Sequence, residues 1–392
     1  MTPLMQAFVL EHENDDLQKL ILQSARYPDI DIPFAVQQIK GRRIAKEKTP
    51  SWYANKDIVY PKHLSLEQSS SEATASYKAK LFGGDSFVDL TGGMGVDFSF
   101  LARNYKHSVY VESQPYLSDL TRKNLNTLGI DGVTVLNEDG VAYLNEMDHV
   151  DTIYIDPARR DTEGRKTVKI EDCSPNIAEI DDILNQKSDI IVIKLSPMLD
   201  ISLALESVTN VSDVYVISHK NECKELLLVK KTNASLSEVM YHCVNIKNDN
   251  GTDEFSFTKQ EELSAHCEYT SQIGHYLYEP NASVMKAGAY KVVAERYGLK
   301  KFHANSHLYT SSKLHEDFPG RRFKVMTPFS LNKREIKEYI GGLDKANIAI
   351  RNFPVSVDEL RKRLKMKDGG EDYIFATTLY DSSKVLILCR KA

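Results

Sequence analysis

Three glycines, Gly92, Gly93 and Gly95, follow the apolar run 87–90. Glycines at a point where a strand turns into a helix let the backbone approach a ligand without Cβ collisions. Glu112 ends the next apolar run, 20 positions after Gly92. A carboxylate in this place binds the ribose hydroxyls in nucleotide-binding α/β sheets. The spacing therefore predicts a loop that binds a nucleoside.

Carboxylates flank the same loop, with Asp89 before the glycines and Asp97 after them. These charges would repel a pyrophosphate and attract a cation. A G-x-G-x-x-G count from Gly93 also places Phe98 where a dinucleotide loop has its third glycine. S-adenosylmethionine has a sulfonium, an ammonium and no phosphate, so the charges favour it over NAD. A dinucleotide enzyme and an ordinary glycine turn are the alternatives.

A third carboxylate, Asp139, follows the apolar run 133–136. In this place we expect it to accept a hydrogen bond from an adenine amine. The same side chain can cap a helix over residues 141–144. The two roles are compatible.

The acceptor side is predicted at Asp156, which ends the apolar run 152–155 and precedes Pro157. The Asp156 carboxylate and a following backbone carbonyl can accept both hydrogens of an amine and aim its lone pair at a methyl group. Methyl transfer is an in-line displacement, so positioning supplies much of the rate. Ala158 and Arg159 come next, and Arg159 can stack on a base or contact phosphate. A turn with surface arginines is the alternative.

Other side chains near these strand ends carry weaker signals. Lys194 ends the fifth apolar run. A contact with the substrate and a purely structural place at the end of the strand are equally favoured for this residue. Cys173 is the nearest cysteine, but it more readily precedes a helix than acts as a nucleophile. No His and Cys spacing forms a four-ligand set, so we expect no metal.

The order of the elements predicts how these residues are brought together. Short apolar runs alternate with helix-period segments over residues 66–231, which predicts a doubly wound, parallel α/β sheet. The last run, 225–231, follows its predecessor too closely for a helical crossover and is expected to pair antiparallel with it. Residues 1–65 read as a helical segment and 232–392 as an α+β domain. Helices are expected in the latter over residues 283–297, 332–340 and 357–364.

Composition excludes several classes of protein. The chain has 392 residues, of which 42% are hydrophobic and 27% charged, and a net charge of −5. No apolar run approaches the ~18 residues of a membrane helix, and the acidic start lacks a signal-peptide pattern. Five dispersed cysteines favour a reducing cytoplasm over disulfides. Residues 300–367 hold sixteen Lys and Arg against seven Asp and Glu, which indicates either a polyanionic partner or a solvated surface.

Residues 66–231 resemble the class I S-adenosylmethionine-dependent methyltransferases. The resemblance implies that the donor lies over the carboxyl ends of the strands that lead to Asp89, Glu112, Asp139 and Asp156. Six segments resemble one group of these enzymes more specifically: 66–75, 156–160, 194–197, 278–282, 308–310 and 317–321. These segments resemble a bacterial family of such enzymes with a C-terminal THUMP-like domain, which implies an RNA-directed enzyme.

The resemblance also implies a contact upstream of the first strand, where nucleic-acid methyltransferases touch the methionine end of the donor. The candidates are Gln68, Ser69, Ser70 and Thr74. Helix capping is an equal alternative for this segment.

A set of basic residues is expected to contact RNA phosphates: Arg321, Arg322, Lys324, Lys333 and Arg334. Phe318, Phe323 and Phe329 lie between them and belong either to this surface or to the core. We therefore expect a cytoplasmic methyltransferase that acts on a base nitrogen of structured RNA, such as tRNA or rRNA. A small-molecule or protein methyltransferase with the same donor, and a binding protein without catalysis, are the alternatives.

Overall fold

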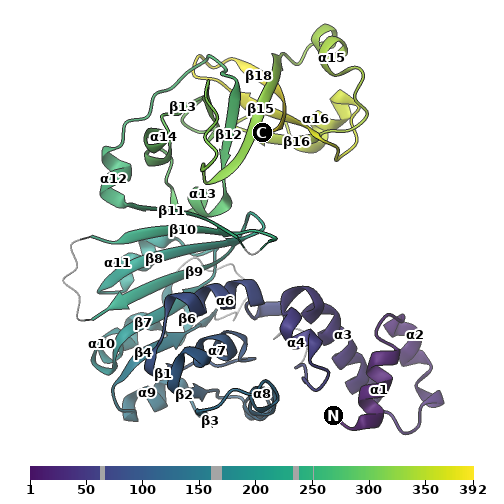
Figure 1. The fold of residues 1–392 in the computed structure, drawn as a ribbon, viewed down its shortest axis with the longest axis vertical. Helices are drawn as coiled ribbons and strands as arrows, with labels where there is room; N and C mark the ends of the chain where they lie inside the picture. The colour runs from purple at the N-terminus through teal and green to yellow at the C-terminus, as the bar shows by residue number, and fades with distance from the viewer. Residues whose placement is uncertain (62–66, 160–169, 233–237, 250) are drawn as a thin grey trace. The chain divides into compact units, whose positions relative to one another are not determined.

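The computed structural model describes all residues except 62–66, 160–169, 233–237 and 250. The chain divides into two compact units (Figure 1). The first comprises Met1–His219 with Lys224–Ser237, and the second comprises Lys220–Cys223 with Glu238–Ala392. The domain boundaries expected at residues 65 and 231 stay predictions.

The first unit begins with four helices: α1 (Pro3–Glu11), α2 (Leu17–Leu22), α3 (Ile32–Lys48) and α4 (Pro50–Ala54). The sequence marks their starts, since Asp16 and Asp31 accept hydrogen bonds from the first N–H groups of α2 and α3. Such caps satisfy N–H groups that have no partner within the helix. Apolar side chains of α1, α2 and α3 pack into a separate small core around Phe8, Val9 and Ile39.

A seven-stranded part of a sheet follows, in the order β8-β9-β7-β4-β1-β2-β3. Its strands are β1 (Gly84–Asp89), β2 (Tyr105–Val111), β3 (Val133–Leu136), β4 (Val150–Ile155), β7 (Ser188–Leu195), β8 (Val211–His219) and β9 (Glu222–Lys231). The pairs among β3, β2, β1, β4 and β7 are parallel, whereas β9 is antiparallel to β7. The doubly wound fold with an antiparallel last strand is confirmed, and β9 lies between β7 and β8.

Helix α6 (Glu72–Leu81) precedes β1, and further helices lie between the strands: α7 (Val96–Leu101), α8 (Pro115–Thr127), α9 (Gly140–Glu146), α10 (Ile177–Lys187) and α11 (Ile201–Ser207). The first three cover one face of the sheet and the last three cover the other (Figure 1). The central strands are therefore buried on both faces, and Val88, Ile153 and Ile191 are at most 1% exposed. This explains why the strands read as continuous apolar runs rather than as alternating ones.

The second unit contains the hairpin of β10 (Met240–Ile246) and β11 (Thr252–Thr258), helix α12 (Lys259–Ser264) and a mixed sheet. The order of that sheet is β13-β14-β12-β15-β18-β17-β16. Its strands are β12 (Tyr276–Pro280), β13 (Lys300–Lys301), β14 (Tyr309–Ser311), β15 (Gly320–Phe329), β16 (Asn347–Arg351), β17 (Asp372–Thr378) and β18 (Lys384–Lys391). The expected α+β architecture is confirmed.

One helix of this unit differs from the expectation. Residues 283–297 form two short helices, α13 (Ala282–Ala287) and α14 (Val292–Arg296), instead of one. Gly288 ends α13 with a φ of +80°, a left-handed conformation that glycine adopts without strain. The apolar period continues through the break, so periodicity alone predicts a single helix.

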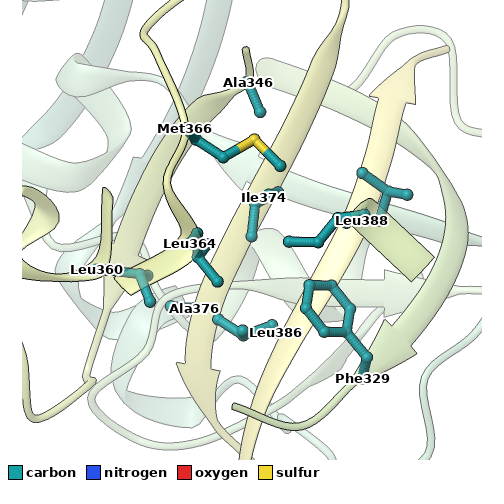
Figure 2. Close-up of a cluster of buried hydrophobic side chains, with 10 residues drawn as sticks. Phe329, Ala346, Leu360, Leu364, Met366, Ile374, Ala376, Leu386 and Leu388 are labelled. Carbon is teal, nitrogen blue, oxygen red and sulfur yellow. The ribbon is translucent and has the colours of Figure 1, made fainter. Parts of the chain in front are cut away.

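Helices α15 (Lys333–Ile340) and α16 (Val357–Leu364) agree with the expectation. Leu360 and Leu364 of α16 pack on Ile374, Ala376 and the neighbouring strand β18 in a continuous core (Figure 2). Burial of each such leucine stabilises the fold by roughly 1.5–3 kcal/mol. Among the described helices of the whole chain, none is long and apolar enough to span a membrane.

Candidate donor and acceptor site

The carboxyl ends of four parallel strands lie side by side. Asp89, the last residue of β1, is in register with Tyr110 on β2 and Tyr154 on β4. Strand β7 extends the same edge, since Ile155 of β4 is in register with Ile193. The loops that leave these strands therefore meet at one edge of the sheet, where α/β proteins bind ligands.

Close packing and backbone conformation favour glycine at three positions of the loop after β1. A Cβ at Gly92 would lie 2.2 Å from Cε2 of Tyr110, and a Cβ at Gly95 would lie 2.6 Å from Cγ2 of Thr121. Gly93 and Gly95 also have φ angles of +58° and +77°, which side chains disfavour. The three predicted glycines therefore set the path of the loop into α7.

Glu112 lies where the sequence predicts a ribose-binding carboxylate, and it holds this loop. The N–H of Gly93 donates a 2.8 Å hydrogen bond to Oε2 of Glu112, and the N–H of Gln114 donates one of 2.8 Å to Oε1. The Gly93 carbonyl accepts hydrogen bonds from the hydroxyls of Tyr110 and Thr121. The Gly93 peptide is thus fixed on both sides.

Asp139 is exposed and caps α9, since its Oδ1 accepts hydrogen bonds from Val141 and Ala142 at 2.9 and 3.0 Å. The helix-capping alternative is therefore realised; the adenine contact stays a prediction. A Cβ at Gly140 would lie 2.0 Å from the carbonyl oxygen of Leu90. This close approach brings the start of α9 to the end of β1, and sequence reasoning did not predict it.

Thr91 joins the donor loop to the acceptor motif. Its N–H donates a 2.9 Å hydrogen bond and its hydroxyl a 3.3 Å hydrogen bond to Oδ1 of Asp89. The same hydroxyl accepts a 2.7 Å hydrogen bond from the N–H of Asp156. Sequence reasoning missed Thr91, although its place between a carboxylate and the glycines was an available signal.

Asp89 is buried, and burial raises the pKa of its carboxyl to about 8. The N–H of Thr91 opposes this shift, whereas the nearby carboxylates of Asp97 and Asp156 add to it. Asp89 is therefore mostly protonated at pH 7 and adds little to the negative field around the loop.

Six buried residues next to the donor loop form what we call the ion cluster: Ser70, Lys78, Asp97, Tyr154, Lys194 and Glu225. Nζ of Lys78 lies 2.8 Å from Oδ1 of Asp97, and Nζ of Lys194 lies 3.1 Å from Oδ2. The hydroxyls of Ser70 and Tyr154 donate to Oδ2 of Asp97 at 2.6 and 2.7 Å. Lys78 also pairs with Oε1 of Glu225 at 2.7 Å. The cluster therefore ties α6, α7, β4, β7 and β9 together.

The charges of the ion cluster neutralise one another. Burial alone would raise the pKa of Asp97, but the ammonium groups of Lys78 and Lys194 hold it well below its usual range. Burial alone would lower the pKa of Lys194, but Asp156 and Asp97 raise it. Of the two carboxylates that flank the glycines, Asp89 is thus protonated and Asp97 is paired inside the protein. Glu112 and Asp139, the other two carboxylates predicted at the loop, accept backbone hydrogen bonds and form no ion pair within the described residues.

Asp156 lies at the open end of the ion cluster. Nζ of Lys194 is 2.5 Å from its Oδ2, and its side chain is 41% exposed. Pro157 is buried, and Arg159 belongs to the short strand β5 (Ala158–Arg159), which pairs with β6 (Cys173–Ser174). Arg160, which follows in the predicted motif, lies outside the described residues.

Residues 68–74, upstream of β1, were expected either to contact the donor or to cap a helix, and both kinds of position are found among them. Ser71 caps α6 by accepting a 3.3 Å hydrogen bond from the N–H of Thr74, which is buried. Ser70 belongs to the ion cluster, whereas Gln68 is exposed and Ser69 partly buried. The structure thus brings Ser70 to the site edge and gives Thr74 a local role in the helix.

Two of the predicted RNA-binding residues are engaged within the second unit. Nε of Arg321 donates a 2.7 Å hydrogen bond to Oε2 of Glu279, and Nη2 of Arg351 lies 2.6 Å from Oε1 of the same buried carboxylate. Arg322 donates to the backbone carbonyl of Glu316. Arg321 is therefore held in place, with its side chain still 39% exposed.

The other three predicted RNA-binding residues are exposed: Lys324, Lys333 and Arg334. Lys324 lies on β15 and the other two lie in the first turn of α15. The three aromatic residues near them are buried and belong to the core: Phe318, Phe323 and Phe329. Within the described residues, no group of His, Cys, Asp and Glu could hold a metal ion.

Comparisons with known proteins place the chain. It is similar over 99% of its length to the crystal structure of a protein from Porphyromonas gingivalis W83 described as a "putative methyltransferase", with 36% identity, 97% of that chain covered and a TM-score of 0.88. Residues 276–319 match a ferredoxin-like domain family and residues 320–391 match the family described as THUMP domain-like. A search of curated proteins found no match.

Two further solved structures are similar over smaller parts. TrmK of M. capricolum, in complex with S-adenosylhomocysteine, has 16% identity and a TM-score of 0.32, covering 41% of this chain and 68% of that one. An rRNA-methylase from Clostridium thermocellum, described as "putative", has 18% identity and a TM-score of 0.31, covering 40% and 95%. These values are too low to support an argument about function. The match over the full length is different in kind, and it shows that this chain belongs to the methyltransferase family with a C-terminal THUMP-like domain.

Proposed function

We propose that the protein transfers the methyl group of S-adenosylmethionine to a base nitrogen of structured RNA, such as tRNA or rRNA. The observation that carries this proposal is the link made by Thr91. One hydroxyl contacts both Asp89, which leads into the glycine loop, and the backbone of Asp156. The donor loop and the acceptor carboxylate are therefore held at a fixed spacing, as an in-line displacement requires.

The residues at the donor loop fit a cationic nucleoside. The backbone at Gly92 and Gly95 is packed so closely that a side chain would collide with Tyr110 or Thr121, which fixes the path of the loop. Glu112 and Asp139 add negative charge that attracts a sulfonium and an ammonium and would repel a pyrophosphate. When bound, S-adenosylmethionine supplies the methyl group. Glu112, Asp139 and the three glycines would hold it.

The acceptor would be held by Asp156. Its carboxylate is half-exposed at the strand edge, and with a following backbone carbonyl it can accept both hydrogens of an exocyclic amine. This arrangement aims the lone pair of the nitrogen along the line of transfer. Pro157 lies between Asp156 and β5. The role predicted for Arg159, stacking on the base or contacting a phosphate, stays a prediction because its side chain lies outside the described part of the chain.

The second unit supports an RNA substrate over a small molecule or a protein. It holds the basic span 300–367 and matches the THUMP domain-like family. Lys324, Lys333 and Arg334 offer exposed charge for phosphates. Arg321 and Arg351 add two half-exposed guanidinium groups that share the buried Glu279. None of the five cysteines forms a disulfide within the described residues, which supports a reducing cytoplasm as the place of action.

The test is nucleoside mass spectrometry of RNA from cells with and without this gene, combined with transfer from labelled S-adenosylmethionine to the RNA of the deleted strain. We expect one methylated nucleoside to be lost in the cells and restored in the reaction. Labelling of a small molecule or a protein in extracts, with unchanged RNA, would favour the first alternative. Tight donor binding without methyl transfer to RNA, to a small molecule or to a protein would indicate a binding protein.

A further inference from the structure

Lys194 contacts the proposed acceptor-binding carboxylate directly, and the function assigned so far does not use it. We propose that Lys194 is a positioning residue for Asp156, holding Oδ2 so that Oδ1 is presented to the acceptor amine. This inference rests on the proposed function of the site.

The sheet register places the two side chains together. Ile155 on β4 and Ile193 on β7 are in register in a parallel pair, so the next residues, Asp156 directly after β4 and Lys194 near the end of β7, lie side by side. Nζ of Lys194 then reaches Oδ2 of Asp156 at 2.5 Å. The contact therefore follows from the two strand ends and does not depend on a long loop.

Lys194 is itself fixed on its inner side. Its ammonium lies 3.1 Å from Oδ2 of Asp97 and 3.1 Å from Oγ of Ser70, and the residue is 8% exposed. An ammonium has three N–H donors, and the oxygens of Asp97, Ser70 and Asp156 account for all three. The position of Lys194 is therefore determined by the ion cluster.

Asp156 is fixed at its backbone N–H and at one of its two carboxylate oxygens. Its N–H donates to Thr91 and its Oδ2 pairs with Lys194. Within the described residues, Oδ1 has no hydrogen-bond partner, and the side chain is 41% exposed. A carboxylate held by one oxygen in this way presents the other in a defined direction, and such preorganisation lowers the cost of orienting a substrate.

Lys78 provides a matched comparison within the same cluster. It is buried, it carries the same charge, and it pairs with Asp97 at 2.8 Å and with Glu225 at 2.7 Å. None of the contacts of Lys78 within the described residues reaches Asp156. Lys78 and Lys194 therefore share the role of neutralising Asp97, whereas Lys194 alone of the two contacts the acceptor carboxylate.

The test is a double-mutant cycle with Lys194→Met, Asp156→Asn and the combination, measured as methyl transfer from S-adenosylmethionine to RNA of the deleted strain. We expect Lys194→Met to lower kcat by about 100-fold while the Kd for S-adenosylmethionine, measured by calorimetry, changes by less than about threefold. In the Asp156→Asn background the same substitution is expected to cost less than about threefold, because coupled residues are not additive. Equal losses in both backgrounds, or a lost donor affinity, would overturn the inference.

Two controls separate positioning from folding. Lys78→Met is expected to lower stability and to combine additively with Asp156→Asn. Lys230→Met removes another buried lysine of the same sheet, paired with Asp181, and is expected to leave kcat unchanged. If Lys194→Met does not fold, Lys194→Gln keeps an N–H donor without the charge and enters the same cycle.

A crystal structure of each variant gives a readout that does not need the RNA substrate. The Asp156 carboxylate should keep its single position in Lys78→Met and lose it in Lys194→Met. An unchanged carboxylate in Lys194→Met would contradict the inference. Wild-type protein that methylates no RNA would contradict the proposed function instead, and the crystallographic comparison would still decide the role of Lys194.

Discussion

The strand-end site of the first unit and the basic surface of the second unit use charge in opposite ways. Around the donor loop, Asp97, Lys78 and Lys194 are buried and neutralise one another. On the second unit, Lys324 and Lys333 are exposed and retain their charge for a partner. Charge in the first region therefore fixes geometry, and its loss should affect folding and chemistry together. Charge in the second region should affect affinity alone, in a manner that depends on salt.

The largest effect is expected at Asp156. Asp156→Ala should lower methyl transfer by about 10³-fold, because the acceptor nitrogen loses its fixed hydrogen-bond acceptor. Donor affinity should stay within about threefold, since Glu112 and the glycine loop are untouched. Calorimetry and single-turnover transfer measure the two quantities. Normal transfer to RNA by this variant would show that the acceptor role is wrongly assigned.

A comparable effect, on stability, is expected at Asp97. Asp97→Ala leaves the buried ammonium groups of Lys78 and Lys194 without their shared partner, which costs about 3–5 kcal/mol. Urea denaturation followed by circular dichroism measures this loss. Asp85→Ala is the control, because it breaks a pair with Lys106 in which both side chains are at least 70% exposed, and its midpoint should not move.

The basic surface should give a smaller effect on binding. Replacing Lys324, Lys333 and Arg334 together by alanine is expected to weaken RNA binding about tenfold at moderate salt and to flatten its salt dependence. Stability should be unaffected, because all three side chains are exposed. Filter binding across a salt series tests this, with Lys40→Ala as a control on the first unit. An unchanged salt dependence would mean that RNA binds elsewhere.

The smallest effect concerns pH and Asp89. Burial raises the pKa of this carboxyl to about 8, so it is protonated below pH 8 and ionised above. A cationic donor favours the ionised form, so its affinity should rise a few-fold between pH 7 and pH 9. Asp89→Asn should remove this part of the pH dependence, which calorimetry at several pH values can resolve. Identical pH profiles of donor affinity for the wild type and Asp89→Asn would refute the role assigned to the Asp89 carboxyl.

Local patterns were sufficient to predict the scaffold. The apolar runs predicted the strands of the first sheet. The short connection before residues 225–231 predicted that this strand lies beside its predecessor, and β9 is indeed the neighbour of β8; its antiparallel pairing with β7 on the other side was not predicted. The glycine spacing predicted the loop because Gly93 and Gly95 need positive φ angles. These features depend on residues close together in the chain, so a single sequence contains them.

The partners inside the site could not be predicted in the same way. Lys78 and Glu225 are 147 positions apart, and each reads as an ordinary surface charge in its own helix or strand. Asp97 was expected to face a ligand because only its neighbours in the chain were considered. The break at Gly288 was missed for a related reason, since the apolar period continues through it. Tertiary contacts, which local patterns do not contain, decide these cases.

The central claim is that the loop at Gly92, Gly93 and Gly95 binds a positively charged sulfur nucleoside. Isothermal titration of the full chain with S-adenosylmethionine, and in parallel with NAD, tests it most directly. We predict saturable binding of one S-adenosylmethionine per chain, weakened by Gly92→Ala, and no heat with NAD. Saturable binding of NAD without any binding of S-adenosylmethionine would contradict the account.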